Sequence, residues 1–280
     1  MFTTHLINLG HDVLACARRP FDEFIIETRK AELRAPADVV IEPAEAAGRG
    51  PVDWLFVGLK GHQTDGAAAW FAELSGPNTT IVTLQNGVEG VERMEPHGNG
   101  AHVVPAVVYC EAELVAPGHV IHRSAARLVA PNTKQGHALA ELFAGSPARI
   151  DATDAHLNEA FYKLAVNVVF NGVTALANKP LGVLRTGAMP QLVQTLVEEV
   201  FEVARAEGST LNKTDVERFM AGVSKVSESG LTSMLQDRRA GRPSEVDAIH
   251  SAVTRLGIKH SIPTPLTTAV GALVAAGDPA

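Results

Sequence analysis

The sequence contains only two cysteines, Cys16 and Cys110, among its 280 residues. Neither belongs to a C-x-x-C pair, which excludes a disulfide framework and a cysteine-rich zinc site. The 11 histidines include no H-x-x-x-H spacing, which a helical zinc site would need. These absences predict a protein of a reducing compartment that holds no metal.

Positive charge and long apolar runs are also scarce. The sequence has 24 lysines and arginines against 31 aspartates and glutamates, whereas a nucleic-acid-binding surface needs a basic excess. No run reaches about 18 uncharged apolar residues, and the N-terminal residues lack the basic and apolar regions of a signal peptide. No G-x-S-x-G or comparable nucleophile motif occurs. We therefore expect a cytoplasmic enzyme for small molecules, with neither nucleic acid nor a membrane as partner.

The first half of the sequence alternates short apolar runs with segments of helical composition. Runs such as WLFVGL and TIVTL are continuously apolar, which is typical of parallel strands buried on both faces. The pattern predicts a parallel sheet with crossover helices, and a turn at Pro117-Gly118 between two antiparallel strands. The predicted strands are Val13–Ala17, Asp53–Leu59, Thr80–Leu84, His102–Tyr109, Val107–Leu114, His119–Arg123 and Ala126–Ala130.

The second half shows helical spacing and almost no strand signal after Ile150. Apolar residues recur at helical intervals between Pro190 and Gly208, which fit the start and the end of a helix. Further helices are predicted at Asp154–Ala177, Leu231–Ala240, Ser244–Leu256 and Leu266–Ala276. The sequence thus predicts an α/β domain over residues 1–151 and a helical domain over residues 152–280.

A dinucleotide-binding domain opens with a strand, a G-x-G-x-x-G turn and a helix whose N-terminal amides receive the pyrophosphate. This sequence begins instead with a predicted helix that ends at Gly10. Gly48-Arg49-Gly50 and Gly98-Asn99-Gly100 lack the last glycine and a preceding strand, so both are predicted to be loops. The α/β domain is therefore expected to be incomplete at its start.

Polar residues nevertheless follow three of the predicted strands, where ligands of open α/β sheets bind. Arg18 follows the first strand and suits the 2′-phosphate of NADP, although a solvated pair with Arg19 explains it equally well. Lys60 and Gln63 follow the second strand, and Asn86 follows the third. These three are candidate cofactor contacts, while Asn86-Gly87 also favours a turn by itself.

The most informative segment is FYKLAVNVVFNGVTALA. Lys163, Asn167 and Asn171 recur every fourth residue and share one face of the predicted helix. The positions around them are mostly apolar, and a buried helix needs a reason to hold a lysine. This narrow polar stripe favours a ligand-binding cleft over a solvated surface, because only one of its three side chains is charged.

A second polar segment runs from Thr232 to Asp247. Ser244 and Asp247 have the spacing of a capping box, and Glu245 in a first helical turn is favourable with the helix dipole. Both features explain these residues structurally. A catalytic role for Glu245 is the alternative.

Together these segments resemble the ketopantoate reductase (2-dehydropantoate 2-reductase) family over nearly the whole chain. The matching motifs are LGHDVLACARRP, LQNG, AELVAPGHVIH, KLAVNVVFNGVTAL, SMLQDRRAGRPSEVDAI and IPTP. The resemblance implies an N-terminal Rossmann domain, a helical C-terminal domain of the 6-phosphogluconate dehydrogenase type, and an active site in the cleft between them. It also implies NADPH-dependent reduction of ketopantoate, a 2-oxo acid, to pantoate, a step toward pantothenate and coenzyme A.

The resemblance implies a role for each candidate residue. Lys163 would be the general acid, and Glu245 would contact the substrate hydroxyl and the cofactor side. The substrate would be held by Asn86, Asn167, Asn171 and Ser233. NADPH would be contacted by Arg18, Lys60, Gln63, Asn86 and Glu245. The resemblance is also compatible with a homodimer.

The sequence departs from the family at its start, where family members have the strand and the glycine turn that are absent here. A start codon assigned downstream, a fragment and a truncated natural protein would each explain this difference. Three functions therefore stay open: ketopantoate reduction, action as a related 2-oxo or β-hydroxyacid dehydrogenase on another substrate, and a catalytically silent remnant.

Overall fold

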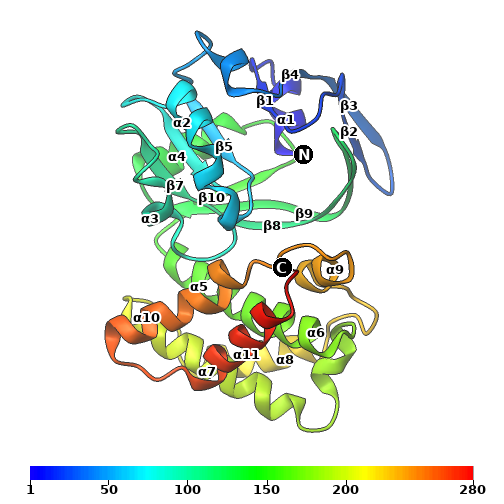
Figure 1. The fold of residues 1–280 in the computed structure, drawn as a ribbon, viewed down its shortest axis with the longest axis vertical. Coiled ribbons are helices and arrows are strands. Elements are labelled where there is room, and N and C mark those ends of the chain that lie inside the picture. The colour runs from blue at the N-terminus through cyan, green and yellow to red at the C-terminus, as the bar shows by residue number, and fades with distance from the viewer. Residues whose placement is uncertain (280) are drawn as a thin grey trace. The chain divides into compact units, whose positions relative to one another are not determined.

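The computed structural model describes residues 1–279, apart from the side chains of residues 124 and 125, and divides into two compact units (Figure 1). The α/β unit comprises Met1–Leu59, Gln63–Gln85 and Gly90–His156. The helical unit comprises Lys60–His62, Asn86–Glu89 and Leu157–Ala280. Two short segments that follow strands of the α/β unit therefore pack within the helical unit.

Two parallel sheets form one part of the α/β unit. β5 (Trp54–Val57), β6 (Thr80–Thr83) and β7 (His102–Pro105) lie in that order, while β1 (Leu14–Cys16) pairs with β4 (Asp38–Val40). Every residue of β6 is buried, as its continuously apolar run predicts for a central strand. The expected Rossmann-like parallel sheet is confirmed. The helices and 3-10 turns of this unit are α1 (Phe2–Asn8), η1 (Pro43–Ala46), η3 (Asp65–Ala67), α2 (Ala68–Leu74), α3 (Gly90–Met94) and α4 (Lys134–Leu142). A further 3-10 turn, η2 (Gly61–Gln63), has its first two residues in the helical unit and its last in the α/β unit.

A third sheet is built around one long strand, β9 (His119–Pro131). β8 (Val107–Ala116) pairs with it in antiparallel direction, and β10 (Arg149–Thr153) and β2 (Glu23–Glu27) pair with it in parallel direction. The predicted turn at Pro117-Gly118 is confirmed: Gly118 has a φ of +73°, and a Cβ there would clash with the Glu23 carbonyl oxygen. The two strands predicted at His119–Arg123 and Ala126–Ala130 are parts of β9.

Four strands were not predicted from the sequence: β2, β3 (Glu32–Pro36), β4 and β10. β2 and β3 pair with each other in antiparallel direction, and β2 also pairs with β9, far away in the sequence. Both are short and carry charged residues (EFIIE and ELRAP), so they lack the apolar run of the central strands. These two segments become strands because they pair with other strands, and local composition does not reveal such pairing.

The helical unit contains the helices predicted for the second half, together with one further α-helix and the 3-10 helix η5. Its core gathers large buried side chains of several helices, including Phe161, Phe201 and Phe219, and α7 packs against both α10 and α11 (Figure 1). The further α-helix is α8, which begins with a capping box formed by Asn212 and Asp215. The elements are α5 (His156–Val166), η4 (Asn167–Asn171), α6 (Gly172–Ala177), η5 (Leu181–Arg185), α7 (Met189–Ala206), α8 (Lys213–Val223), α9 (Ser233–Arg239), η6 (Asp247–Ser251), α10 (Ala252–His260) and α11 (Pro265–Ala276).

Two π-helical turns, η4 and η6, interrupt helices that the sequence predicts as continuous. They contact each other through His250, whose Nε2 lies 3.1 Å from the Val168 carbonyl oxygen. Gly172 leaves room for this ring, because a Cβ there would clash with Nε2. Burial lowers the pKa of His250 to about 4, so the imidazole is neutral and donates from Nε2 to the carbonyl.

The helical stretch His156–Ala177, formed by α5, η4 and α6, is long and apolar enough to cross a membrane. Of its most apolar window, however, 61% is buried inside the fold, as in the core helix of a soluble protein. Its burial against other helices therefore explains its composition.

Candidate active site

Three asparagine side chains of the helical unit form a hydrogen-bonded row, which we name the amide ladder: Asn86, Asn167 and Asn171. Asn171 Nδ2 donates to Asn167 Oδ1 at 3.3 Å, and Asn167 Nδ2 donates to Asn86 Oδ1 at 3.2 Å. Asn167 and Asn171 stand at the two ends of η4 and are only 7% and 4% exposed. The two asparagines of the predicted polar stripe are therefore buried, and Asn167 is linked to a residue 81 positions before it.

One end of the amide ladder rests on the start of α9. Asn171 Oδ1 accepts hydrogen bonds from the backbone N–H of Met234 at 3.2 Å and from Ser233 Oγ at 3.3 Å. Thr232 caps this helix by accepting from the Leu235 N–H, and its hydroxyl pairs with that of Thr174 on α6. The cap and this hydroxyl pair fix Ser233 and Met234 beside Asn171.

The other end of the amide ladder meets Glu245. Asn86 Nδ2 donates to Glu245 Oε2 at 2.9 Å, so this partly buried carboxylate ends the row. The structure thus brings together five of the predicted site residues, namely Asn86, Asn167, Asn171, Ser233 and Glu245.

Asn86 is held in place by the three residues that follow it. Gly87 has a φ of +102° and passes so close to η6 that a Cβ would clash with the Ala248 carbonyl oxygen. Val88 packs against the helical core. The Glu89 carboxylate accepts two hydrogen bonds from Arg255, at 2.5 and 3.0 Å. The segment Asn86–Glu89 is therefore fastened to η6 and α10, which follow directly after Glu245 in the sequence.

Lys163 lies on α5, one helical turn before Asn167. Its side chain is partly buried in a stretch where Phe161, Leu164 and Ala165 are fully buried. The lysine is therefore the cationic member of the polar stripe that continues as the amide ladder.

Lys60 makes a contact that its sequence neighbours do not predict. Its Nζ lies 2.5 Å from Asp237 Oδ2, and the other oxygen of this buried carboxylate accepts from Arg242 Nε at 2.9 Å. The sequence offered one indication of this contact, namely that Asp237 is the single acidic residue in the basic run DRRAGR. Asp237 thus fixes Lys60 on the helical unit.

Arg18 and Gln63 lie in the α/β unit. Arg18 is exposed just beyond the carboxyl end of β1, and Gln63 is half-buried at the end of η2. The capping box predicted for Ser244 and Asp247 is wrong. The Ser244 backbone N–H and Oγ both donate to Asp278 Oδ2, at 3.2 and 2.7 Å, and Asp247 Oδ1 accepts from Arg255 at 2.7 Å. Asp278 follows the end of α11 and Arg255 lies on α10, so both partners come from outside the first helical turn.

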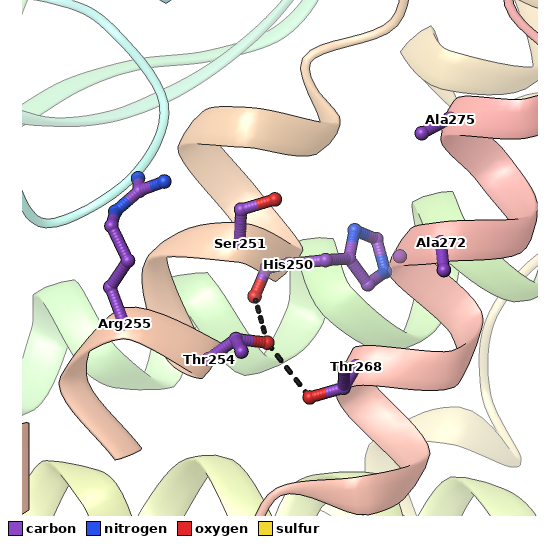
Figure 2. A pocket seen from close by; sticks show the side chains of 8 residues that line it. His250, Ser251, Thr254, Arg255, Thr268, Ala272 and Ala275 are labelled. Carbon is purple, nitrogen blue, oxygen red and sulfur yellow. Dashed lines mark hydrogen bonds between the residues drawn. The ribbon is translucent and has the colours of Figure 1, made fainter. Parts of the chain in front are cut away.

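A cavity of about 260 Å³ lies between η6–α10 and α11 (Figure 2). Thr254 donates to the His250 carbonyl oxygen and pairs with Thr268 on its floor, while Gly271, Ala272 and Ala275 line the α11 side. Figure 2 shows the Arg255 guanidinium pointing away from Thr254 and Thr268. None of the predicted site residues lines this cavity, so it is separate from the amide ladder.

Comparisons with known proteins identify the family. The family model described as ketopantoate reductase PanE/ApbA matches residues 1–135, and its C-terminal counterpart matches residues 155–278. A 2-dehydropantoate 2-reductase of Caulobacter vibrioides is 35% identical over 94% of this chain and 90% of its own length. The chain belongs to the ketopantoate reductase family.

Solved structures agree with this membership. A PanE/ApbA family ketopantoate reductase from Ralstonia eutropha superposes with a TM-score of 0.87 at 28% identity, over 99% of this chain and 93% of that one. A D-mandelate dehydrogenase, solved with NADH and anilino(oxo)acetate, superposes with a TM-score of 0.85 at 21% identity, over 99% of this chain and 94% of that one. The latter likeness shows the fold alone.

Proposed function

We propose that this ketopantoate reductase family member is a cytoplasmic enzyme that reduces ketopantoate to pantoate with NADPH, with Lys163 as the general acid. The observation that carries the proposal is the placement of Lys163 one turn before an uncharged amide row that ends on a carboxylate. A 2-oxo acid needs neutral hydrogen-bond donors for its oxygens and one proton donor for its ketone. This group of residues offers both.

The residues of the chain account for the proton side of the reaction. When bound, the nicotinamide supplies the hydride, which is chemistry of the cofactor itself. Negative charge then develops on the ketone oxygen, and the protonated amine of Lys163 stabilises it and transfers its proton to that oxygen. Asn86, Asn167, Asn171 and Ser233 would orient the substrate, and Glu245 would accept a hydrogen bond from its hydroxyl. A carbonyl that gains a hydride and a proton becomes the product alcohol.

The residues present fit parts of the nucleotide. The exposed guanidinium of Arg18, beyond the carboxyl end of β1, fits the 2′-phosphate of NADP. Lys60, Gln63, Asn86 and Glu245 would contact the rest of the cofactor. No G-x-G-x-x-G turn is present in the sequence to receive the pyrophosphate. Replacement Arg18→Glu is expected to weaken binding of NADPH more than binding of NADH, as measured by fluorescence titration.

The alternative is a related dehydrogenase that acts on a different 2-oxo acid. The fold likeness to a D-mandelate dehydrogenase supports it, because that protein carries an aromatic 2-oxo compound and NADH on the same fold. A panel of 2-oxo acids, tested with both nicotinamides, separates the two. The homodimer stays a prediction.

The test of the proposed acid compares Lys163→Met with Lys225→Met, which removes an exposed lysine after α8. Loss of a general acid is expected to lower kcat by about 10²–10⁴-fold, while NADPH binding changes little. Lys225→Met is expected to match the parent. Near-parental turnover of Lys163→Met would refute the assigned role. The proposed function would be refuted if the parent chain bound NADPH but none of the tested 2-oxo acids led to its oxidation.

A further inference from the structure

We infer that the backbone N–H of Met234 fixes the direction in which the amide ladder donates its hydrogen bonds, and thereby makes Asn86 a donor to Glu245. A side-chain amide can turn over and exchange its oxygen with its NH₂ group, so a row of amides by itself has two directions. A backbone N–H is always a donor. The direction of the row is therefore set where a backbone group meets it.

The direction passes from one amide to the next. Because Met234 and Ser233 both donate to Asn171, the atom that faces them is its oxygen. Its nitrogen then faces Asn167 and must find an acceptor there. The same requirement repeats at Asn86, since Asn167 uses its oxygen toward Asn171 and its nitrogen toward Asn86.

The far end of the row agrees with this direction. Asn86 presents its nitrogen to Glu245 Oε2 at 2.9 Å, and a carboxylate accepts hydrogen bonds but does not donate them. In the reverse direction the Asn86 oxygen would face the carboxylate with no proton between them. An obligatory donor at one end and an obligatory acceptor at the other therefore select the same arrangement. Burial of Asn167 and Asn171 keeps water from satisfying a reversed amide.

This arrangement has a consequence for the site, which rests on the proposed function. Within the described residues, the second N–H of each ladder amide forms no hydrogen bond. The row thus keeps three uncharged N–H groups for the oxygens of a 2-oxo acid, while Glu245 is held as an acceptor for a substrate hydroxyl. Met234 is accordingly a positioning residue that acts through its backbone alone.

The decisive experiment reverses the row with one isosteric change, Asn171→Asp. The new carboxylate still accepts from Met234 and Ser233, but it has no N–H to give to Asn167. Asn167 must then turn over, Asn86 must follow, and the Asn86 oxygen meets the Glu245 carboxylate. We expect the melting temperature of the ligand-free protein to fall by about 2–4 °C or more.

The partner change is Glu245→Gln, which supplies an amide that can itself turn over and donate to a reversed Asn86. It is expected to restore most of the melting temperature that Asn171→Asp loses. Because both changes also alter charge, the same pair is compared in an Asn86→Ala background, which interrupts the row. In that background Glu245→Gln should no longer restore the melting temperature. If the rescue came instead from relief of direct repulsion between two carboxylates, it would persist there.

If the single variant Asn171→Asp does not fold, Asn167→Asp takes its place. It removes the N–H that Asn167 gives to Asn86, so Asn86 must again turn over, and it is tested in the same way. Additive losses for Asn171→Asp and Glu245→Gln would overturn the inference, and so would a rescue that survives in the Asn86→Ala background. Since the readout is thermal unfolding without substrate or cofactor, its outcome is independent of whether the chain reduces ketopantoate.

Discussion

Lys60 Nζ lies 2.5 Å from Asp237 Oδ2, although the two residues are 177 positions apart in the sequence. Asp237 is only 5% exposed, and Arg242 takes its second oxygen. The short segment that follows β5 is therefore attached to α9 through one buried carboxylate. Because α9 also anchors the amide ladder, Asp237 joins the strand-end lysine to the proposed substrate site.

The first prediction concerns this carboxylate. Asp237→Asn keeps the size of the side chain but removes the charge that holds Lys60 and Arg242. We expect the free energy of unfolding to fall by about 1–2 kcal/mol, since a buried charge-assisted hydrogen bond is lost. NADPH affinity should also change if Lys60 contacts the cofactor. Urea unfolding and fluorescence titration measure the two effects.

The matched control for Asp237→Asn is Glu228→Gln. Glu228 pairs with Arg185 at 3.0 Å, but its side chain is 86% exposed. Exposed pairs contribute about 0–1 kcal/mol, so the stability of this variant should stay near that of the parent. Equal losses in the two variants would show that burial of Asp237 does not matter.

The second prediction concerns Gly87. Gly87→Ala introduces a Cβ that clashes with the Ala248 carbonyl oxygen, at a φ of +102° that side chains rarely adopt. The segment from Asn86 to Glu89 must move, so both stability and substrate affinity should fall, with a cost in stability above about 1–2 kcal/mol. Gly222→Ala is the control, because its Cβ meets nothing within 4 Å on α8, and it should stabilise the protein slightly. An unchanged KM in Gly87→Ala would argue against the placement of Asn86 in the substrate site.

Local pattern was enough to predict the polar stripe on the helix of Lys163, because three polar residues at helical spacing among apolar ones are visible in any window. The ends of α7, marked by Pro190 and Gly208, and the strands β5, β6 and β7 were predictable for the same reason. These features depend on neighbours in the sequence.

The π-helical turn at Asn167–Asn171 could not be predicted in this way. It forms where the His250 ring from another helix reaches the Val168 carbonyl oxygen, 82 positions away in the sequence. The position of Asn86 could not be predicted either, because an asparagine at the end of a strand does not indicate that its segment packs within the helical unit. Only Gly87 and Val88, an unusual turn followed by an apolar residue, hinted at this packing.

The third prediction concerns the pair of Glu89 and Arg255. Arg255 is 44% exposed and Glu89 18% exposed, so screening by water limits the strength of the pair. A double-mutant cycle with Glu89→Gln and Arg255→Met is expected to give a coupling free energy of about 0.5–1 kcal/mol in urea unfolding. Hydrogen exchange of the Asn86–Glu89 amides should speed up in either variant. Purely additive effects would mean that the pair does not fasten this segment.

The fourth prediction is that acidification lowers the free energy of unfolding because His250 is kept neutral in the folded protein. Burial lowers the pKa of His250 from 6.5 to about 4, and its Nδ1 has no partner among the described residues. In the unfolded chain this imidazole takes up a proton as the pH falls below about 6.5, whereas the folded protein resists protonation until about pH 4. The unfolded state therefore binds more protons in this window, and the stability supplied by the neutral ring is present above pH 6.5 and is lost toward pH 4.

Between about pH 7 and about pH 4.5 the parent should lose about 2–3 kcal/mol more than His250→Gln, whose amide can still donate to the Val168 carbonyl oxygen without titrating. Urea unfolding at both pH values measures this difference, and because all other titrating groups are common to the two proteins, equal losses would show that His250 is not kept neutral by the fold.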